Sequence, residues 1–227
     1  MGKHSRIVKM TRLDSENQTY TDNILPEPAH CSHNHSNLAS VIWPSTEDAK
    51  QISAKGIAHR LAKVAYFPES WHAPFMAAQY AVELAAMLRK VGTLAQLHAL
   101  LANAHEAYLG HIPPVARAAE LAMTTPPLVT DRRDVLQDSM HGRIMAALQI
   151  PDFGTLSGEV HNSILYARDQ LDATLERDLG AVIYRTHSRA PAPLARVITP
   201  YRWDHTIDRY LRCYSDFTAL CGLPDRR

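Results

Sequence analysis

NAHEAYLGHIP, residues 103–113, is the stretch that decides the fold of this chain, because it closes a long run of helical spacing. Apolar residues recur every three or four positions, at Leu94, Leu97, Leu101, Ala104 and Tyr108. Gly110 and the Pro113-Pro114 pair follow, and these residue types commonly end a helix. The spacing therefore predicts one buried helix that ends before Gly110.

The same helical spacing continues on both sides of this stretch. Residues 76–89 are rich in Ala, Leu, Met and Val, and Gly92 followed by Thr93 indicates a stop and a new start, so the two segments form a buried helix hairpin. Further helices are expected from a start signal STED at 45–48, and from apolar spacing at 57–65 before Pro68, at 135–148, at 160–179 and at 204–220. No run of alternating β-branched residues predicts a strand, so the expected fold class is all-α.

Length and charge limit the classes of function. The 227 residues are 46% hydrophobic and 21% charged, which is typical of one globular domain with an extension. The formal net charge of +1 gives no overall attraction to nucleic acid or to an anionic membrane. The first residues carry no apolar run of the kind a secretory signal needs, so we expect a cytoplasmic protein with no membrane segment. Cys213 and Cys221 are expected to be ordinary thiols, because they lack CxxC spacing.

Residues 1–38 show no periodicity and are rich in Ser, Asn, Thr and His, which predicts an irregular N-terminal arm before a helical domain at 39–227. The arm contains a cluster of potential zinc ligands, namely His30, Cys31, His33 and His35. Their spacing matches no compact zinc module, so a solvated polar loop is the preferred interpretation. His59 is likewise interpreted as a packed or capping residue.

Several segments resemble the HD-type nucleotide phosphohydrolases related to 5′-deoxynucleotidases and phage dATP hydrolases. NAHEAYLGHIP resembles the signature helix of that family, which reads roughly HDAHEAYLGDIP. KGIAHRLAKVAYF at 55–67 and AAQYAVELA at 77–85 are similar to its opening helices. ARDQLDATLERDL at 167–179 and the segment 193–220 are similar to its later helices. The resemblance covers about residues 42–220 in order, and it implies an HD-domain helical bundle.

The resemblance also implies where a divalent metal would bind, and the residues there are poor ligands. In the family, His, His, Asp and Asp converge on one metal ion that activates water. The corresponding positions here carry Tyr80, Ala102, Asn103 and Arg168. Alanine has no donor atom, a phenol stays protonated near neutral pH, an amide offers only a neutral oxygen and a guanidinium repels a cation. A shift of one residue would place Asp169 at the last position. We therefore expect no metal cofactor.

Other family positions are partly kept. The glutamate that orients water in the family corresponds to Glu106, its later aspartate to His111 and its nucleotide-side arginine to Tyr66. Arg168 sits within an apolar stripe formed by Ile164, Leu171 and Leu175, and a buried arginine needs a partner. Two interpretations stay open. Either Arg168 fills the space of the metal and pairs with Glu106, with Tyr80 and Asn103 completing the hydrogen bonds, or its guanidinium reaches the surface.

Three functions remain, with a non-catalytic protein that acts by assembly or ligand binding as the preferred one. Its expected partner is a second copy or a larger assembly. The first alternative is a deoxynucleotide phosphohydrolase with a displaced Mg²⁺, Mn²⁺, Co²⁺ or Zn²⁺ site built from His105, Glu106, His111 and Asp169. The second is a sensor in which Arg168, His105 and His111 bind a deoxynucleotide or phosphate without turnover.

Overall fold

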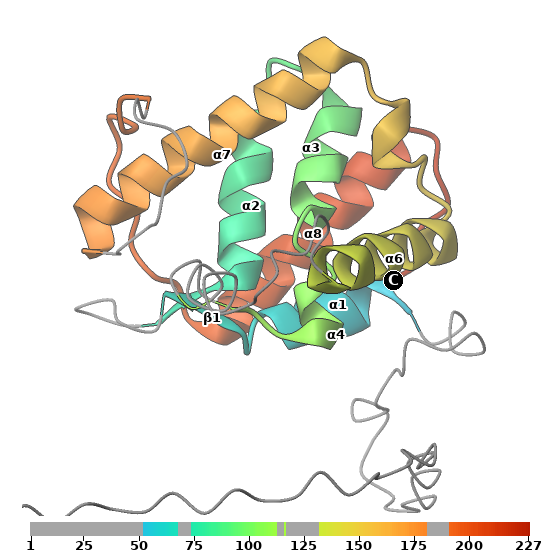
Figure 1. Cartoon of the computed structure of the whole chain (residues 1–227), viewed down its shortest axis with the longest axis horizontal. Helices are drawn as coiled ribbons and strands as arrows, with labels where there is room; N and C mark the ends of the chain where they lie inside the picture. Colours follow the sequence, from blue (N-terminus) through green and yellow to red (C-terminus); the bar gives the residue numbers. More distant parts are fainter. Residues whose placement is uncertain (1–51, 68–73, 113–115, 117–131, 181–190) are drawn as a thin grey trace, which may run out of the picture. The chain divides into compact units, whose positions relative to one another are not determined.

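The computed structural model describes residues 52–67, 74–112, 116, 132–180 and 191–227 (Figure 1). All of them belong to the unit Ser40–Arg227. The predicted arm at 1–38, with its His30, Cys31, His33 and His35 cluster, lies outside the described residues, and so does the helix start at 45–48. The predicted boundary between arm and helical domain stays a prediction.

The described residues are mostly helical, as the spacing predicts. The helices are α1 Ala54–Leu61, α2 Ala77–Met87, α3 Thr93–Leu101, α4 Glu106–Leu109, α6 Arg132–Leu148, α7 Gly158–Leu179 and α8 Trp203–Leu220, with a short 3-10 helix at Phe153–Thr155. The strands β1 Ala65–Phe67 and β2 Phe75–Met76 pair antiparallel, which the all-α expectation did not include. Among the helices in the described ranges, none combines the length and the apolar character that a bilayer-spanning segment needs.

The core forms around the α2–α3 hairpin, as expected. Every residue of α2 from Ala77 to Ala85 is buried, and the chain turns into α3 at Gly92, whose φ of 139° favours glycine. α8 packs against α1, α2 and α3, and α7 packs against α2 and α3 (Figure 1). The Tyr210 hydroxyl of α8 donates to the Leu100 carbonyl of α3 at 3.2 Å, so even the polar end of this buried ring is satisfied.

The predicted continuous helix from Leu94 to Tyr108 is wrong, because α3 ends at Leu101 and α4 begins only at Glu106. Between them the backbone bonds run three residues back, as from Ala104 N to Leu101 O at 2.9 Å and from Glu106 N to Asn103 O at 3.0 Å. Such bonds tighten the chain relative to an α-helix. Apolar spacing cannot reveal this change, since the buried side chains keep nearly the same periodicity.

The predicted helix at 57–65 is too long by one turn. α1 begins after Ser53, whose side chain accepts a hydrogen bond from Gly56 N, and it ends at Leu61. The next residues form β1, in which Ala65 pairs with Met76. Pairing with a segment ten residues further along the chain therefore overrides the local helical spacing.

Candidate functional site

The structure brings the predicted site residues together from five segments. Tyr66 comes from β1, Tyr80 from α2, Asn103 from the turn after α3 and Arg168 from α7. Glu106 and His111 lie at the start of α4 and after its end. The contacts described below join these six side chains into one polar cluster within an apolar core.

Tyr66 lies at the centre of the cluster. Its ring stacks on that of Tyr80 with centroids 4.3 Å apart, and the His111 ring lies 4.4 Å away. The Asn103 amide donates to the Tyr66 hydroxyl oxygen at 3.3 Å. Burial raises the pKa of Tyr66 to about 12, and the positive charge of Arg168 opposes that rise. Tyr66 is therefore a neutral phenol at any physiological pH.

Arg168 points into the protein and contacts the cluster. Its Nη2 atom donates to Asn103 Oδ1 at 3.4 Å. The Tyr80 hydroxyl donates to Asp172 Oδ1 at 2.8 Å, and burial raises the pKa of Tyr80 well above its usual value of 10.0. The Tyr66 and Tyr80 phenols, and then the Asp172 carboxylate, raise the pKa of Arg168 further above its ordinary value. Arg168 is thus a permanent cation, and Asp172, one turn along α7, is the carboxylate that contributes to holding it charged.

The predicted ion pair between Arg168 and Glu106 does not form. Glu106 Oε1 instead contacts His111 Nδ1 at 3.1 Å, and both side chains are less than a tenth exposed. Because a carboxylate accepts, the proton of this hydrogen bond lies on Nδ1 of His111. Glu106 Oε2 and His111 Nε2 are buried and have no hydrogen-bond partner among the described residues.

The donor groups do not fit the divalent metal that the sequence resemblance implies. Tyr80 uses its proton to bond Asp172 and stays neutral. Asn103 offers a neutral oxygen that already accepts from Arg168, and Arg168 is a cation. A divalent ion requires several anionic or neutral donors directed at one point. A fixed positive charge among these positions opposes that requirement.

A cavity of about 200 Å³ adjoins the cluster on the side of α6. It is lined by Leu84, Ala102, His105, Gln137, Asp138, His141, Phe153, Ile164, Leu165 and Arg168. Ala102 and His105, the two remaining predicted site residues, thus face the same space as Arg168. One of the two histidines that line the cavity, His141, is neutral near pH 7, because burial lowers its pKa.

His98 of α3 lies close to this cavity and is only 1% exposed. Both of its ring nitrogens are buried without a hydrogen-bond partner among the described residues. Its ring centroid lies 5.7 Å from that of Phe153. Burial, and then the proximity of His141, lowers the pKa of His98 to about 4, so its ring is neutral in the folded protein at pH 7.

We expect His98→Leu to stabilise the protein by about 1–2 kcal/mol at pH 7, since it removes two buried unpaired nitrogens. This stability difference grows as the pH falls, because the pKa of His98 is lower in the folded state than in the unfolded state, so protonation favours unfolding of the wild type. Between pH 6.5 and 4 the free energy of unfolding of the wild type falls by up to about 3 kcal/mol through this proton binding, and the leucine variant does not show this fall. Urea unfolding of the wild type and the variant at pH 7 and at pH 5 measures the stability difference and its dependence on pH. Equal stability of the two proteins at pH 5 would contradict this account.

The other predicted candidates contribute little to the cluster. His59 is half-buried in the last turn of α1. Cys213 and Cys221 are partly buried free thiols, and burial raises the pKa of each. Within the part of the chain that the structure describes, no three His, Cys, Asp or Glu side chains lie close enough to share a metal ion. Of the displaced site predicted with Asp169, the contact between Glu106 and His111 is the part that the structure brings together.

Sequence reasoning missed three polar residues that matter to these helices. Asp172 follows Arg168 by four residues, and that spacing alone could have suggested it as a partner. Gln79 and Glu83 are 1% and 3% exposed within the otherwise apolar α2. Two polar residues four positions apart in such a run are a signal of a buried polar contact.

The chain was compared with protein-family models and with curated proteins, and neither comparison found a match.

Proposed function

We propose that this chain is a non-catalytic protein of the HD fold that acts by assembly or by ligand binding. The sequence resemblance across residues 42–220 supports the fold, together with the helices α1, α2, α3, α7 and α8 in the expected order. The resemblance alone would imply a hydrolase. The contacts of the polar cluster favour a protein without that chemistry.

The observation that carries the proposal is the hydrogen bond between Arg168 and Asn103. These are two of the four positions that the resemblance assigns to metal ligands, and here they bond each other. A third such position, Tyr80, donates to Asp172. Arg168, Asn103 and Tyr80 thus each bond a protein partner, which supports a role of these three side chains in packing.

Phosphate release from deoxynucleoside mono- and triphosphates tests the proposal directly. We expect no release above the rate without protein in Mg²⁺, Mn²⁺, Co²⁺ or Zn²⁺, and no stoichiometric metal in the purified protein. Metal-dependent release that Glu106→Ala abolishes would refute the proposal and favour the displaced metal site. A matched control is Glu159→Ala, because Glu159 is an exposed glutamate on α7.

Binding without turnover is the second candidate, and the cavity beside Arg168 favours it. Its volume of about 200 Å³ is below the roughly 300–1,000 Å³ of sites that enclose drug-sized ligands. The space suits a phosphate group better than a whole nucleotide. Calorimetric titration with inorganic phosphate and with deoxynucleotides, each with and without Mg²⁺ or Co²⁺, separates this candidate from assembly alone.

Assembly is tested by the mass of the full chain in solution. The resemblance favours a homo-oligomer, and α7 exposes two large apolar side chains, with Leu165 45% and Tyr166 59% accessible. If the protein is strictly monomeric and binds neither phosphate nor nucleotide, both forms of the proposal, assembly and ligand binding, are refuted.

A further inference from the structure

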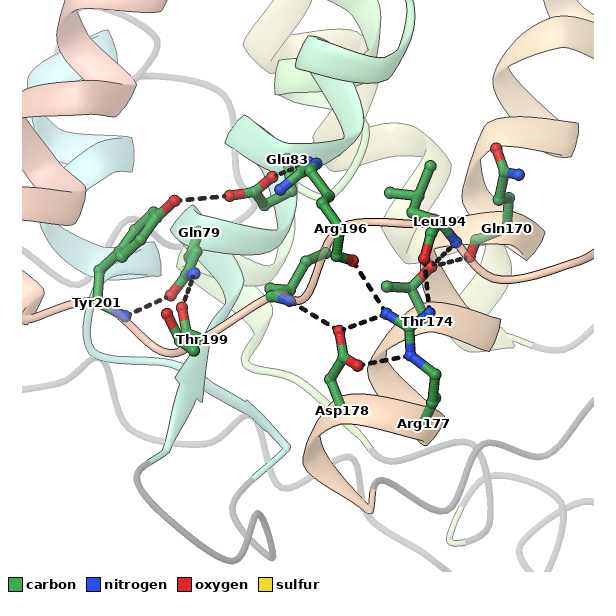
Figure 2. A network of polar contacts seen from close by, with 11 residues as sticks. Gln79, Glu83, Gln170, Thr174, Arg177, Asp178, Leu194, Arg196, Thr199 and Tyr201 are labelled. Atoms are coloured by element: carbon green, nitrogen blue, oxygen red, sulfur yellow. Dashed lines mark hydrogen bonds and ion pairs between the residues drawn. The ribbon is translucent and has the colours of Figure 1, made fainter.

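Residues 191–202, here called the strap, connect to the start of α8 and lie as an extended segment across α2 and α7 (Figure 2). Pro191, Pro193 and Pro200 explain the extended form, because proline fixes its own φ and disfavours helix at the preceding residue. The strap has no helix or strand of its own. Its polar backbone groups therefore need partners elsewhere.

Side chains of α7 supply many of those partners. Gln170 donates to the Ala192 carbonyl at 2.9 Å, and Leu194 N donates to Thr174 Oγ1 at 2.9 Å. Further along, Arg177 donates to the carbonyls of Leu194 and Arg196, and Asp178 accepts from Ile198 N at 2.7 Å. The strap thus runs in the same direction as α7, and these hydrogen bonds join side chains of α7 to the main chain of the strap (Figure 2).

α2 holds the other edge of the strap. The Gln79 amide donates to the Thr199 carbonyl and accepts from Tyr201 N, both at 2.8 Å. Glu83 accepts from the Arg196 guanidinium and from the Tyr201 hydroxyl. The Glu83 side chain is 3% exposed, so its carboxylate needs these partners (Figure 2).

The strap is attached mainly through polar contacts, and Leu194 and Ile198 are its side chains that pack against the hydrophobic core. Ile198 is buried, at 2% exposure, whereas Val197 is 68% exposed and the Arg196 side chain 48%. A segment that buries so little apolar surface opens at a lower free energy than the helices beneath it. It can therefore be exchanged for another segment that makes the same contacts.

The groove between α2 and α7 continues beyond the end of the strap. A cavity of about 750 Å³ begins at Gln170 and Leu194 and is lined further on by Met87, Leu88, Val91, Glu159, Asn162, Ser163, Tyr166 and Ala167. Val91 is 40% exposed, and Tyr166 59%. The cavity is thus lined by both apolar and polar side chains. It adjoins the part of the groove that the strap occupies.

We propose that the α2–α7 groove is a binding site for an extended basic peptide of a partner protein, and that the strap is its resident intramolecular occupant. The strap itself shows which chemistry the groove accepts. An incoming peptide places apolar side chains in the cavity beside Val91, pairs its main chain with Gln79, Thr174 and Asp178, and offers a cation to Glu83. Its chain direction is that of the strap, so its apolar residues precede its cation.

This site is separate from the polar cluster, and it does not depend on whether the cluster binds a metal or a phosphate. Binding of the peptide requires the strap to leave. The strap is part of the same chain, so its effective concentration is on the order of millimolar and it competes strongly. A variant that weakens the strap should therefore bind peptides more tightly.

Two fluorescent peptides test the proposal on the full chain. One has the strap sequence PAPLARVITPYR, and the other carries three additional leucines before it. We expect the leucine extension to tighten binding at least ~10-fold through burial in the cavity, and Val91→Asp to cancel that gain. Replacing the peptide arginine that corresponds to Arg196 by alanine should weaken binding ~10-fold, because Glu83 loses its cation. Arg196→Ala in the protein should tighten binding by a similar factor.

The result that overturns the proposal is the absence of saturable binding of either peptide to Arg196→Ala protein with wild-type helix content. A leucine gain that survives Val91→Asp would equally overturn it, since the extension would then bind elsewhere. If Arg196→Ala fails to fold, hydrogen exchange on the wild type replaces it. Added peptide must then speed exchange of the Leu194 and Ile198 amides, and unchanged exchange rejects displacement of the strap.

Discussion

Arg168→Ala is expected to lower the free energy of unfolding by about 3 kcal/mol, because it removes a partly buried cation from groups that are arranged around it. Asn103 loses its donor at 3.4 Å, and the Asp172 carboxylate loses a neighbouring positive charge. For a domain of this size the melting temperature should fall by roughly 5–10 °C. Thermal unfolding followed by circular dichroism measures it.

Two further substitutions separate the charge of Arg168 from its packing. Arg168→Met keeps most of the apolar stem and removes the charge, so it should be nearly as destabilising as Arg168→Ala. Arg202→Ala removes an arginine whose side chain is 84% exposed, and it should change stability by less than ~0.5 kcal/mol. A methionine variant as stable as the wild type would mean that only the stem of Arg168 matters.

Placing the metal ligands of the HD-type family at the four corresponding positions is expected to create a metal site with a higher affinity than that of the wild type. The fourfold variant Tyr80→His, Ala102→His, Asn103→Asp and Arg168→Asp replaces the phenol, the methyl group, the amide and the cation by donors. The positions lie close together, since Asn103 bonds Arg168 and Ala102 shares a cavity with it. Titration with Co²⁺ should show affinity at least ~100-fold above the wild type.

The matched control is the threefold variant that keeps Arg168. It carries the new histidines and aspartate but retains the cation, so it should bind Co²⁺ no better than the wild type. A fourfold variant that is folded by circular dichroism and gains no affinity would show that these positions do not converge as the resemblance implies. It would then remove the reason for grouping this chain with HD-type proteins.

Local spacing predicts the helices well where packing follows the helical period. α2, α6, α7 and α8 differ from their expected bounds by three residues or fewer at each end. The errors occur where distant partners decide the backbone. Residues 65–67 pair with a strand that begins at Phe75, and the turn before Glu106 forms from bonds that apolar spacing does not encode. Neither partner is visible in the local pattern.

The candidate site was predictable in its members but not in its pairing. The sequence resemblance selects Tyr66, Tyr80, Asn103 and Arg168, and the structure joins them. The resemblance does not include Asp172, and the four-residue spacing from Arg168 is the signal that could have suggested it. The strap is harder still to foresee. Its contacts join Gln79 of α2 to Thr199, which lies 120 positions away.

Because many contacts of the strap involve its main chain, they constrain its amino-acid sequence only weakly. α7 bonds backbone carbonyl groups, which every residue has, and backbone N–H groups, which every residue except proline has. Most side chains of residues 191–202 can therefore be substituted during evolution without loss of these bonds. Two proteins could share this device while having almost no identity along it. An engineer could likewise rewrite the outward positions, such as Val197, to carry a label or a reactive handle.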